Sequence, residues 1–175
     1  MSRTGLRRAG ALAALLAAVA VAAGCGGRSE EDRVRETVSK AADRAEKRDL
    51  EGLGRYLDAG FESGDGRDRA GTLALVAGYL ERRRGVVVHV LGCRVTGIDP
   101  AGRASVEFEV ALSHGAAEVL RKLIRWSGTY YRFAAGLVRD AAGEWRFAAA
   151  HWEEILLTDL FPESLAVLKE LFPDI

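Results

Sequence analysis

The stretch RASVEFEVALSH, residues 103–114, decides the fold class of this chain. Its polar and apolar side chains alternate at every second position, which is the pattern of an antiparallel strand with one buried and one solvated face. Glu107 and Glu109 fall on the solvated face, so we expect surface residues there and not a pair of carboxylates for acid–base chemistry. The buried face would carry Val106, Phe108, Val110 and Leu112.

Three further strand-like segments surround this stretch. Residues 86–98 are rich in β-branched side chains, and residues 125–139 and 144–155 carry many of the aromatic residues. Turn-forming residues separate neighbouring strands at 99–102 and 140–143. The order predicts a four-strand antiparallel meander.

Glycines within the meander predict curvature. Gly128 and Gly136 are candidate bulges in the third strand, where they would bend the sheet without strain. Residues 116–124 fit a helical turn as well as the end of a strand.

Helical periodicity precedes the sheet. Ser29 is a candidate N-cap for a first helix, and a shorter helix is predicted from Asp49 through Leu57. A third helix begins near Asp68, and Pro162 opens a C-terminal helix. Helices segregated from an antiparallel sheet make an α+β domain. The apolar face of the first helix would carry Val34, Val38, Ala41 and Ala45.

Three motifs carry a resemblance to a known superfamily. They are VRETV at 34–38, RDLEGL at 48–53 and DAAGEWRF at 140–147. Together with the long paired strands, they resemble the nuclear-transport-factor-2-like (NTF2-like; SnoaL-like, cystatin-like cone) superfamily over roughly residues 33–155. The resemblance implies N-terminal helices packed in a strongly curved sheet that forms a cone. The superfamily includes isomerases, dehydratases and cyclases as well as non-enzymatic binding and assembly domains.

The first 24 residues predict export. Three arginines precede an apolar run at 9–23, and small residues lead to Cys25. The ending Ala-Ala-Gly-Cys resembles the lipobox of bacterial lipoproteins, with Ala22 where that family usually has Leu. The resemblance implies a signal peptide at 1–24, a lipidated Cys25 and membrane attachment through it. A transmembrane helix and an ordinary secretory signal are the alternatives, but the run is short and Ala-rich for a membrane span.

The rest of the chain would then be a tether at 25–30 and one domain at 31–175. The protein is expected in the cell envelope. Gly26 stands where an Asp tends to mean inner-membrane retention in the lipoprotein family, so we expect the outer membrane in a cell that has two membranes.

The mature net charge is 22 − 25 = −3, because the signal removes three of 25 basic residues and none of 25 acidic ones. That balance gives no indication of nucleic-acid binding. Cys93, among apolar neighbours, is expected to be a buried thiol.

The enzymes of the superfamily place an acid–base group inside the cone, where burial can shift its pKa. His151 follows three alanines that would leave room for a ligand, so it is the first candidate, with Tyr130 and His89 next. The alternative for each of these histidines is a purely structural role, with the side chain hydrogen bonded and partly buried. No cofactor motif and no metal-ligand set is found. The predicted interior residues are Tyr56, His89, Trp126, Tyr130, Tyr131, His151 and Glu153.

Three functions fit these observations. The first is a lipid-anchored binding domain, whose cone holds a small apolar ligand or forms a homodimer interface. The second is an enzyme of the isomerase or dehydratase type that uses a pocket histidine. The third is an envelope assembly factor recognised through its sheet.

Overall fold

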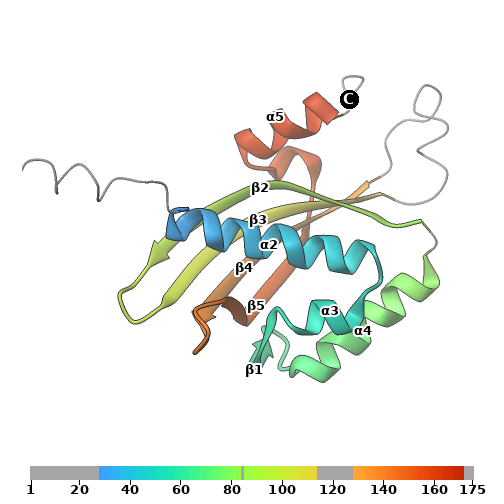
Figure 1. Cartoon of the computed structure of the whole chain (residues 1–175). Coiled ribbons are helices and arrows are strands. Elements are labelled where there is room, and N and C mark those ends of the chain that lie inside the picture. The colour runs from blue at the N-terminus through green and yellow to red at the C-terminus, as the bar shows by residue number, and fades with distance from the viewer. Residues whose placement is uncertain (1–27, 84, 114–127, 172–175) are drawn as a thin grey trace, which may run out of the picture.

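A computed structural model describes residues 28–83, 85–113 and 128–171, and its α+β architecture confirms the predicted fold class (Figure 1). The signal segment with Cys25, residues 116–124 and Trp126 lie outside these ranges. Three helices precede most of the sheet: α2 (Glu30–Glu46), α3 (Leu50–Gly54) and α4 (Arg69–Arg82). No helix of the described ranges is both long and apolar enough to cross a membrane.

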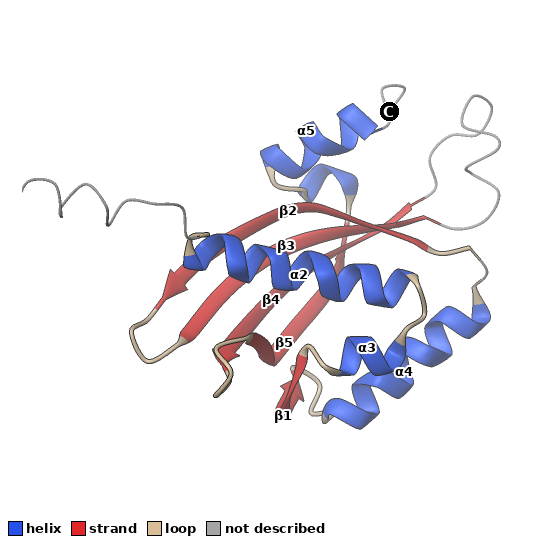
Figure 2. Cartoon of the chain, viewed as in Figure 1, coloured by secondary structure: helices blue, strands red, loops and turns tan. Residues whose placement is uncertain are grey.

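The sheet has five strands where four were predicted (Figure 2). Strands β2 (Val87–Ile98), β3 (Arg103–Ser113), β4 (Gly128–Arg139) and β5 (Trp145–Ile155) form the expected antiparallel meander. The additional strand, β1 (Leu57–Ser63), pairs in parallel with β5.

The prediction of helix through Leu57 is therefore wrong. Helix α3 ends at Gly54, and Leu57 begins β1 opposite Phe147. This pairing joins residues about ninety positions apart in the sequence, so no local sequence pattern indicates it. The buried side chains of Leu57, Phe61 and Ser63 follow the alternation of a strand.

The helix starts agree with the predictions. The Ser29 hydroxyl accepts a hydrogen bond from the backbone N–H of Asp32 at 3.1 Å, and Asp49 and Asp68 cap α3 and α4 in the same way. These caps satisfy backbone donors that a helix leaves unpaired at its first turn.

The concave face of the sheet wraps around α2 (Figure 1). Val34 and Val38 of α2 are almost fully buried against it, together with Trp145 and Phe147 of β5. Phe108 and Phe133 stack there with ring centroids 4.7 Å apart. Apolar burial of this kind is the main stabilising contribution in a domain of this size.

The opposite, outer face is covered by the C-terminal segment. A short 3-10 helix, Leu157–Asp159, leads into α5 (Pro162–Leu171). Leu168 of α5 has no exposed surface and packs with Leu91, Ala111 and Tyr130 of the sheet. Complete burial of such a side chain contributes about 1.5–3 kcal/mol. The predicted C-terminal helix is confirmed, and it covers the outside of the cone.

This cover corrects the expectation for Glu109. Its side chain does face outward, but it has no exposed surface, because the C-terminal segment lies over it. Arg132 donates to one carboxylate oxygen at 2.7 Å, and the backbone N–H of Phe161 donates to the other at 2.9 Å. Glu107 stays partly exposed.

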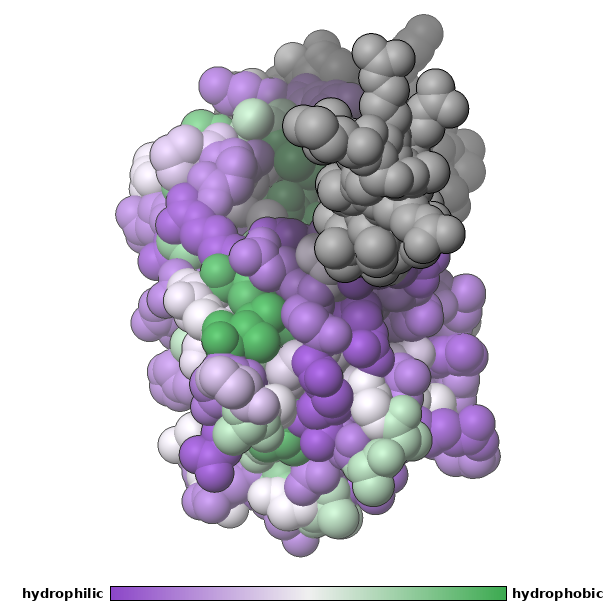
Figure 3. Space-filling view, turned by 60° about the vertical axis from the view of Figure 1, so that its left-hand side comes forward, coloured by the Kyte–Doolittle hydropathy of each residue, from purple (hydrophilic) through white to green (hydrophobic). Residues whose placement is uncertain are grey.

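The strand pairing is irregular at four places, one of them between Leu57 and Glu62 of β1. Another lies beside Gly136, but its extra residue is Ala148 of β5 and not the glycine that was predicted to bulge, and Gly128 pairs regularly with Ser113. Two more interrupt β2 at 90–92 and 95–97, and these were not predicted. Figure 3 shows one face of the folded molecule, which is mostly hydrophilic with small hydrophobic patches between polar residues.

Candidate functional site

The structure divides the predicted pocket residues between the two faces of the sheet. Tyr56 packs against the concave core, and Tyr131 lies on the same face opposite Val110. Tyr130 belongs to the outer cluster, and His89 pairs with Ala111 of that cluster. The residues do not form one pocket.

His151 is exposed and faces outward, so the predicted cavity around it is wrong. The reason is one residue, Ala148, which has no partner in β4: Phe147 pairs with Leu137 and Ala149 pairs with Gly136. Side chains alternate along a strand, so an extra residue moves every later side chain to the other face. Trp152 consequently takes the inward position, where its ring lies 6.1 Å from that of Phe133.

The same shift turns Glu153 outward and Glu154 inward. Ala149 and Ala150, which were expected to leave room for a ligand, pair with Glu62 and Ser63 of β1. The space beside His151 is taken by Gly64, since a Cβ built there would lie 2.4 Å from the His151 Nδ1.

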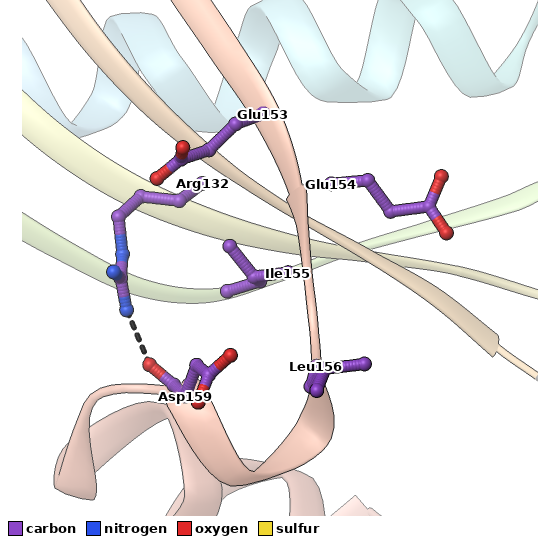
Figure 4. Close-up of a pocket in the computed structure, with 6 residues that line it drawn as sticks. All are labelled: Arg132, Glu153, Glu154, Ile155, Leu156 and Asp159. Atoms are coloured by element: carbon purple, nitrogen blue, oxygen red, sulfur yellow. Dashed lines mark hydrogen bonds between the residues drawn. The ribbon is translucent and has the colours of Figure 1, made fainter.

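A cavity of about 470 Å³ lies instead at the end of β5, and we call it the β5-edge cavity (Figure 4). Figure 4 shows Glu153 and Glu154 projecting to opposite sides of the strand, so the cavity follows the strand's edge. Among the described residues, β1 covers this edge only as far as Ala150. The cavity is lined by Arg132, Glu153, Glu154, Ile155, Leu156 and Asp159.

The charges of the β5-edge cavity are unbalanced. Glu153 and Glu154 form no ion pair with any described residue. Arg132 is the cation of the lining, and its guanidinium is bound by the buried Glu109 and by the carbonyl of Asp159. The lining therefore carries more carboxylates than cations, since Glu153, Glu154 and Asp159 stand against Arg132, which is already paired with Glu109.

An apolar surface accompanies these carboxylates. Leu156 is 70% exposed, and the Ile155 side chain points into the space between Arg132 and Leu156 in Figure 4. A single exposed leucine is common on protein surfaces, but this one lies next to the carboxylates of the cavity. The arrangement suits a molecule that carries a positive charge and an apolar part.

Two tyrosines lie next to Glu154 on the concave side. Tyr131 pairs with Glu154 in the sheet and is hydrogen bonded through its side chain to Tyr79 of α4. Burial raises the pKa of both phenols, and the nearby Glu154 raises them further. Both phenols therefore stay protonated at neutral pH and can donate hydrogen bonds. The guanidinium of Arg83 lies 4.1 Å from the Tyr79 ring centroid.

The C-terminal segment fixes the outer wall of the cavity. Two guanidinium groups lie over the Phe161 ring, that of Arg94 at 3.6 Å and that of Arg132 at 4.5 Å from its centroid. Arg94 also pairs with Glu163, which holds the first turn of α5 against β2. Within the described ranges, no three His, Cys, Asp or Glu side chains converge as a metal site would require.

Sequence reasoning named Glu153 as an interior residue but missed the rest of this lining, because the residues carry no motif. The Glu153-Glu154 pair followed by Ile155-Leu156 is visible in the sequence, but it reads as an ordinary strand end. The bulge at Ala148 and the C-terminal segment that covers Glu109 together bring these residues to one cavity.

No protein-family model matches the sequence, and no curated protein resembles it closely in sequence. Solved structures resemble its fold. A Novosphingobium aromaticivorans protein named "Putative Scytalone Dehydratase" superposes with a TM-score of 0.59 at 14% identity, covering 73% of this chain and 85% of that one. An NTF2-like protein with a cystatin-like fold from the same species gives 0.57 at 15%, covering 95% and 99%.

A Bdellovibrio bacteriovorus protein gives a TM-score of 0.56 at 10% identity, covering 70% of this chain and 40% of that protein. This chain therefore matches less than half of that protein's length. At such identities the likeness concerns the backbone alone. The chain has the NTF2-like cone, also known as the cystatin-like fold.

Proposed function

We propose that this chain is a lipid-anchored protein of the cell envelope whose cone domain binds a small cationic molecule with an apolar part. The observation that carries the proposal is the β5-edge cavity, where unpaired carboxylates adjoin an exposed leucine. The anchor part rests on the export signal at 1–24 and on Cys25.

Electrostatics favours a cation in the β5-edge cavity. Each carboxylate within about 4 Å of a bound ammonium would contribute roughly 1–4 kcal/mol, depending on how well water screens the pair. Glu153 and Glu154 flank the strand from both sides, so an elongated cation can contact both. Ile155 and Leu156 lie next to them and would cover the apolar part of the ligand.

The packing of the concave face supports a binding role over an enzymatic one. Phe108, Phe133 and Trp152 form a continuous aromatic cluster in the region where the enzymes of this fold would need a pocket. Both candidate histidines in the described ranges, His89 and His151, lie on the outer side. We therefore assign binding to the β5-edge cavity, at the rim of the cone, and not to the cone's interior.

Titration of the full-length protein in detergent with dansylcadaverine tests this proposal, because that probe joins a primary ammonium to an apolar fluorophore. We expect saturable binding, and the double variant Glu153→Gln/Glu154→Gln should weaken it about tenfold, equivalent to about 1.4 kcal/mol.

The matched control is Glu62→Gln/Glu107→Gln, which removes the same charge from strands away from the cavity and should leave binding unchanged. Dansylglycine carries the same fluorophore with a negative charge and should not bind. Equal binding of both probes, or equal loss in both double variants, would refute the proposal.

A dehydratase-type enzyme is the second candidate. Two structural neighbours are named as putative dehydratases, and Tyr79, Tyr131 and Glu154 form an acid–base cluster on the concave side. Under this alternative, Glu154→Gln would abolish turnover, whereas in the binding function it would only weaken affinity.

A further inference from the structure

One edge of β5 has no strand beside it after Ala150, within the part of the chain that the structure describes. The last residue pair between β1 and β5 joins Ser63 to Ala150, whereas β4 accompanies the other edge of β5 as far as Ile155. A free strand edge exposes backbone N–H and C=O groups that a further strand can bind. Residues 152–155 of β5 therefore keep one open edge over roughly 13 Å.

The last hydrogen bond between β1 and β5 gives the direction of these backbone groups. The N–H of Gly64 donates to the carbonyl of Ala150 at 2.8 Å, so that carbonyl points to the β1 side. Backbone groups at successive residues of a strand point to alternate edges. The N–H and C=O of Trp152 and Glu154 therefore point to the open edge, where no described strand or loop binds them.

The two carboxylates of the β5-edge cavity flank this open edge on opposite faces of the sheet. Glu153 and Glu154 project to opposite sides of the strand in Figure 4. Neither forms an ion pair with a described residue, and the nearby Arg132 already pairs with Glu109. A second copy of this edge would bring like charges together, which destabilises strand pairing. The charges therefore favour a basic strand over self-association.

The alternation of side chains specifies the sequence of such a strand. A strand laid along this edge would place successive side chains on alternate faces, each on the same face as the β5 residue beside it. Two consecutive basic residues would then lie beside Glu153 and Glu154, one on each face. An apolar residue next to them would lie beside Ile155 and the exposed Leu156.

We propose that the cationic ligand of the β5-edge cavity is a short extended peptide with two consecutive basic residues, bound as an additional strand beside β5. This inference rests on the proposed function, because it uses the same two carboxylates, and it adds the open backbone edge to them. In strand addition, main-chain hydrogen bonds supply affinity and the alternating side chains supply specificity. The peptide would continue the line of β1 along β5.

Isothermal titration of the full-length protein in dodecyl maltoside with acetyl-Leu-Lys-Lys-Leu-amide tests the proposal. This peptide reads the same in both directions, so it serves for a parallel or an antiparallel strand. We expect saturable binding about tenfold tighter than that of dansylcadaverine. Glu153→Gln and Glu154→Gln should each weaken it several-fold, whereas the control Glu62→Gln/Glu107→Gln should leave it unchanged.

Two related peptides separate strand addition from attraction between charges alone. Acetyl-Lys-Leu-Lys-Leu-amide has the same composition, but its lysines share one face. It should bind about tenfold more weakly and respond to only one of the two single variants. Methylation of both lysine backbone nitrogens in the first peptide keeps its charges and removes N–H donors, and it should also weaken binding about tenfold.

The outcomes distinguish this inference from the proposed function. Equal affinity of the three peptides, or binding of dansylcadaverine without binding of any peptide, would overturn the inference and leave the proposed function in place. Failure of both dansylcadaverine and the peptides to bind would overturn both.

Discussion

Gly92 of β2 and Ser164 of α5 touch so closely that no side chain fits between them. A Cβ at Gly92 would lie 2.3 Å from the Ser164 Oγ, while the next nearest atoms are at 3.6 Å. Ser164 is fully buried, and its hydroxyl has no hydrogen-bond partner among the described residues. The glycine at this bulge therefore sets how closely α5 approaches the sheet.

We predict that Gly92→Ala destabilises the domain by about 1–3 kcal/mol, because the added methyl group forces α5 away from the sheet. Denaturant unfolding measures this change. In the double variant Gly92→Ala/Ser164→Ala the clashing oxygen is gone, so most of the stability should return. Ser164→Ala alone should be neutral or slightly stabilising, since it removes a buried hydroxyl without a partner. A double variant no more stable than Gly92→Ala would show that the clash is elsewhere.

Removal of the buried Glu109 carboxylate should be more damaging. Glu109→Ala leaves the Arg132 guanidinium and the Phe161 N–H without their acceptor, and breaking a buried pair in this way costs about 3–5 kcal/mol. Hydrogen exchange should show loss of protection in α5 before the rest of the domain. Glu107→Ala, on the same strand but partly exposed, serves as the control and should change stability by less than about 0.5 kcal/mol.

Cys93 should react slowly with thiol reagents. Cys93 is only partly buried, less than the sequence led us to expect, but burial still raises the pKa of its thiol to about 11, so little thiolate is present at pH 8. We expect the labelling rate in the folded Cys25→Ser variant to rise with pH up to that value and to increase sharply in denaturant. Fast labelling at pH 7 under native conditions would contradict this prediction.

The lipid anchor is tested by Cys25→Ser. The parent protein should fractionate with membranes and incorporate labelled palmitate, whereas the variant should do neither and should remain unprocessed. Ala22→Leu restores the usual residue of the lipobox and should leave anchoring intact. A Cys25→Ser protein that stays membrane-bound with normal processing would exclude lipidation at this residue.

The sequence alone supports the fold class more firmly than the site. The alternation at 103–114 and the caps at Ser29, Asp49 and Asp68 are local signals, and the structure follows them. The parallel pairing of β1 with β5 is non-local, and it was missed. Nothing in the sequence around Ala148 marks the bulge, because alanine fits either face of a sheet.

The bulge at Ala148 accounts for most of the difference between the predicted site and the observed one. Had Ala148 paired with Gly136, His151 would face Phe133 inside the cone, as the alternation from Trp145 and Phe147 predicts. Tyr130 and Tyr131 were likewise both placed in the interior, although neighbours along a strand lie on opposite faces. The face that each residue occupies depends on register, which tertiary pairing decides.

The contact between Trp145 and Glu30 has a consequence for how the domain would stand on a membrane. The indole N–H donates to the Glu30 carboxylate at 3.1 Å, so α2 and β5 begin at the same pole of the molecule. Three residues lie between Cys25 and Ser29, so the four steps along the chain reach at most about 14 Å. A lipid on Cys25 would hold this pole against the bilayer. The other pole, roughly 30 Å along β5, would point into the open compartment, where passing solutes first meet the β5-edge cavity.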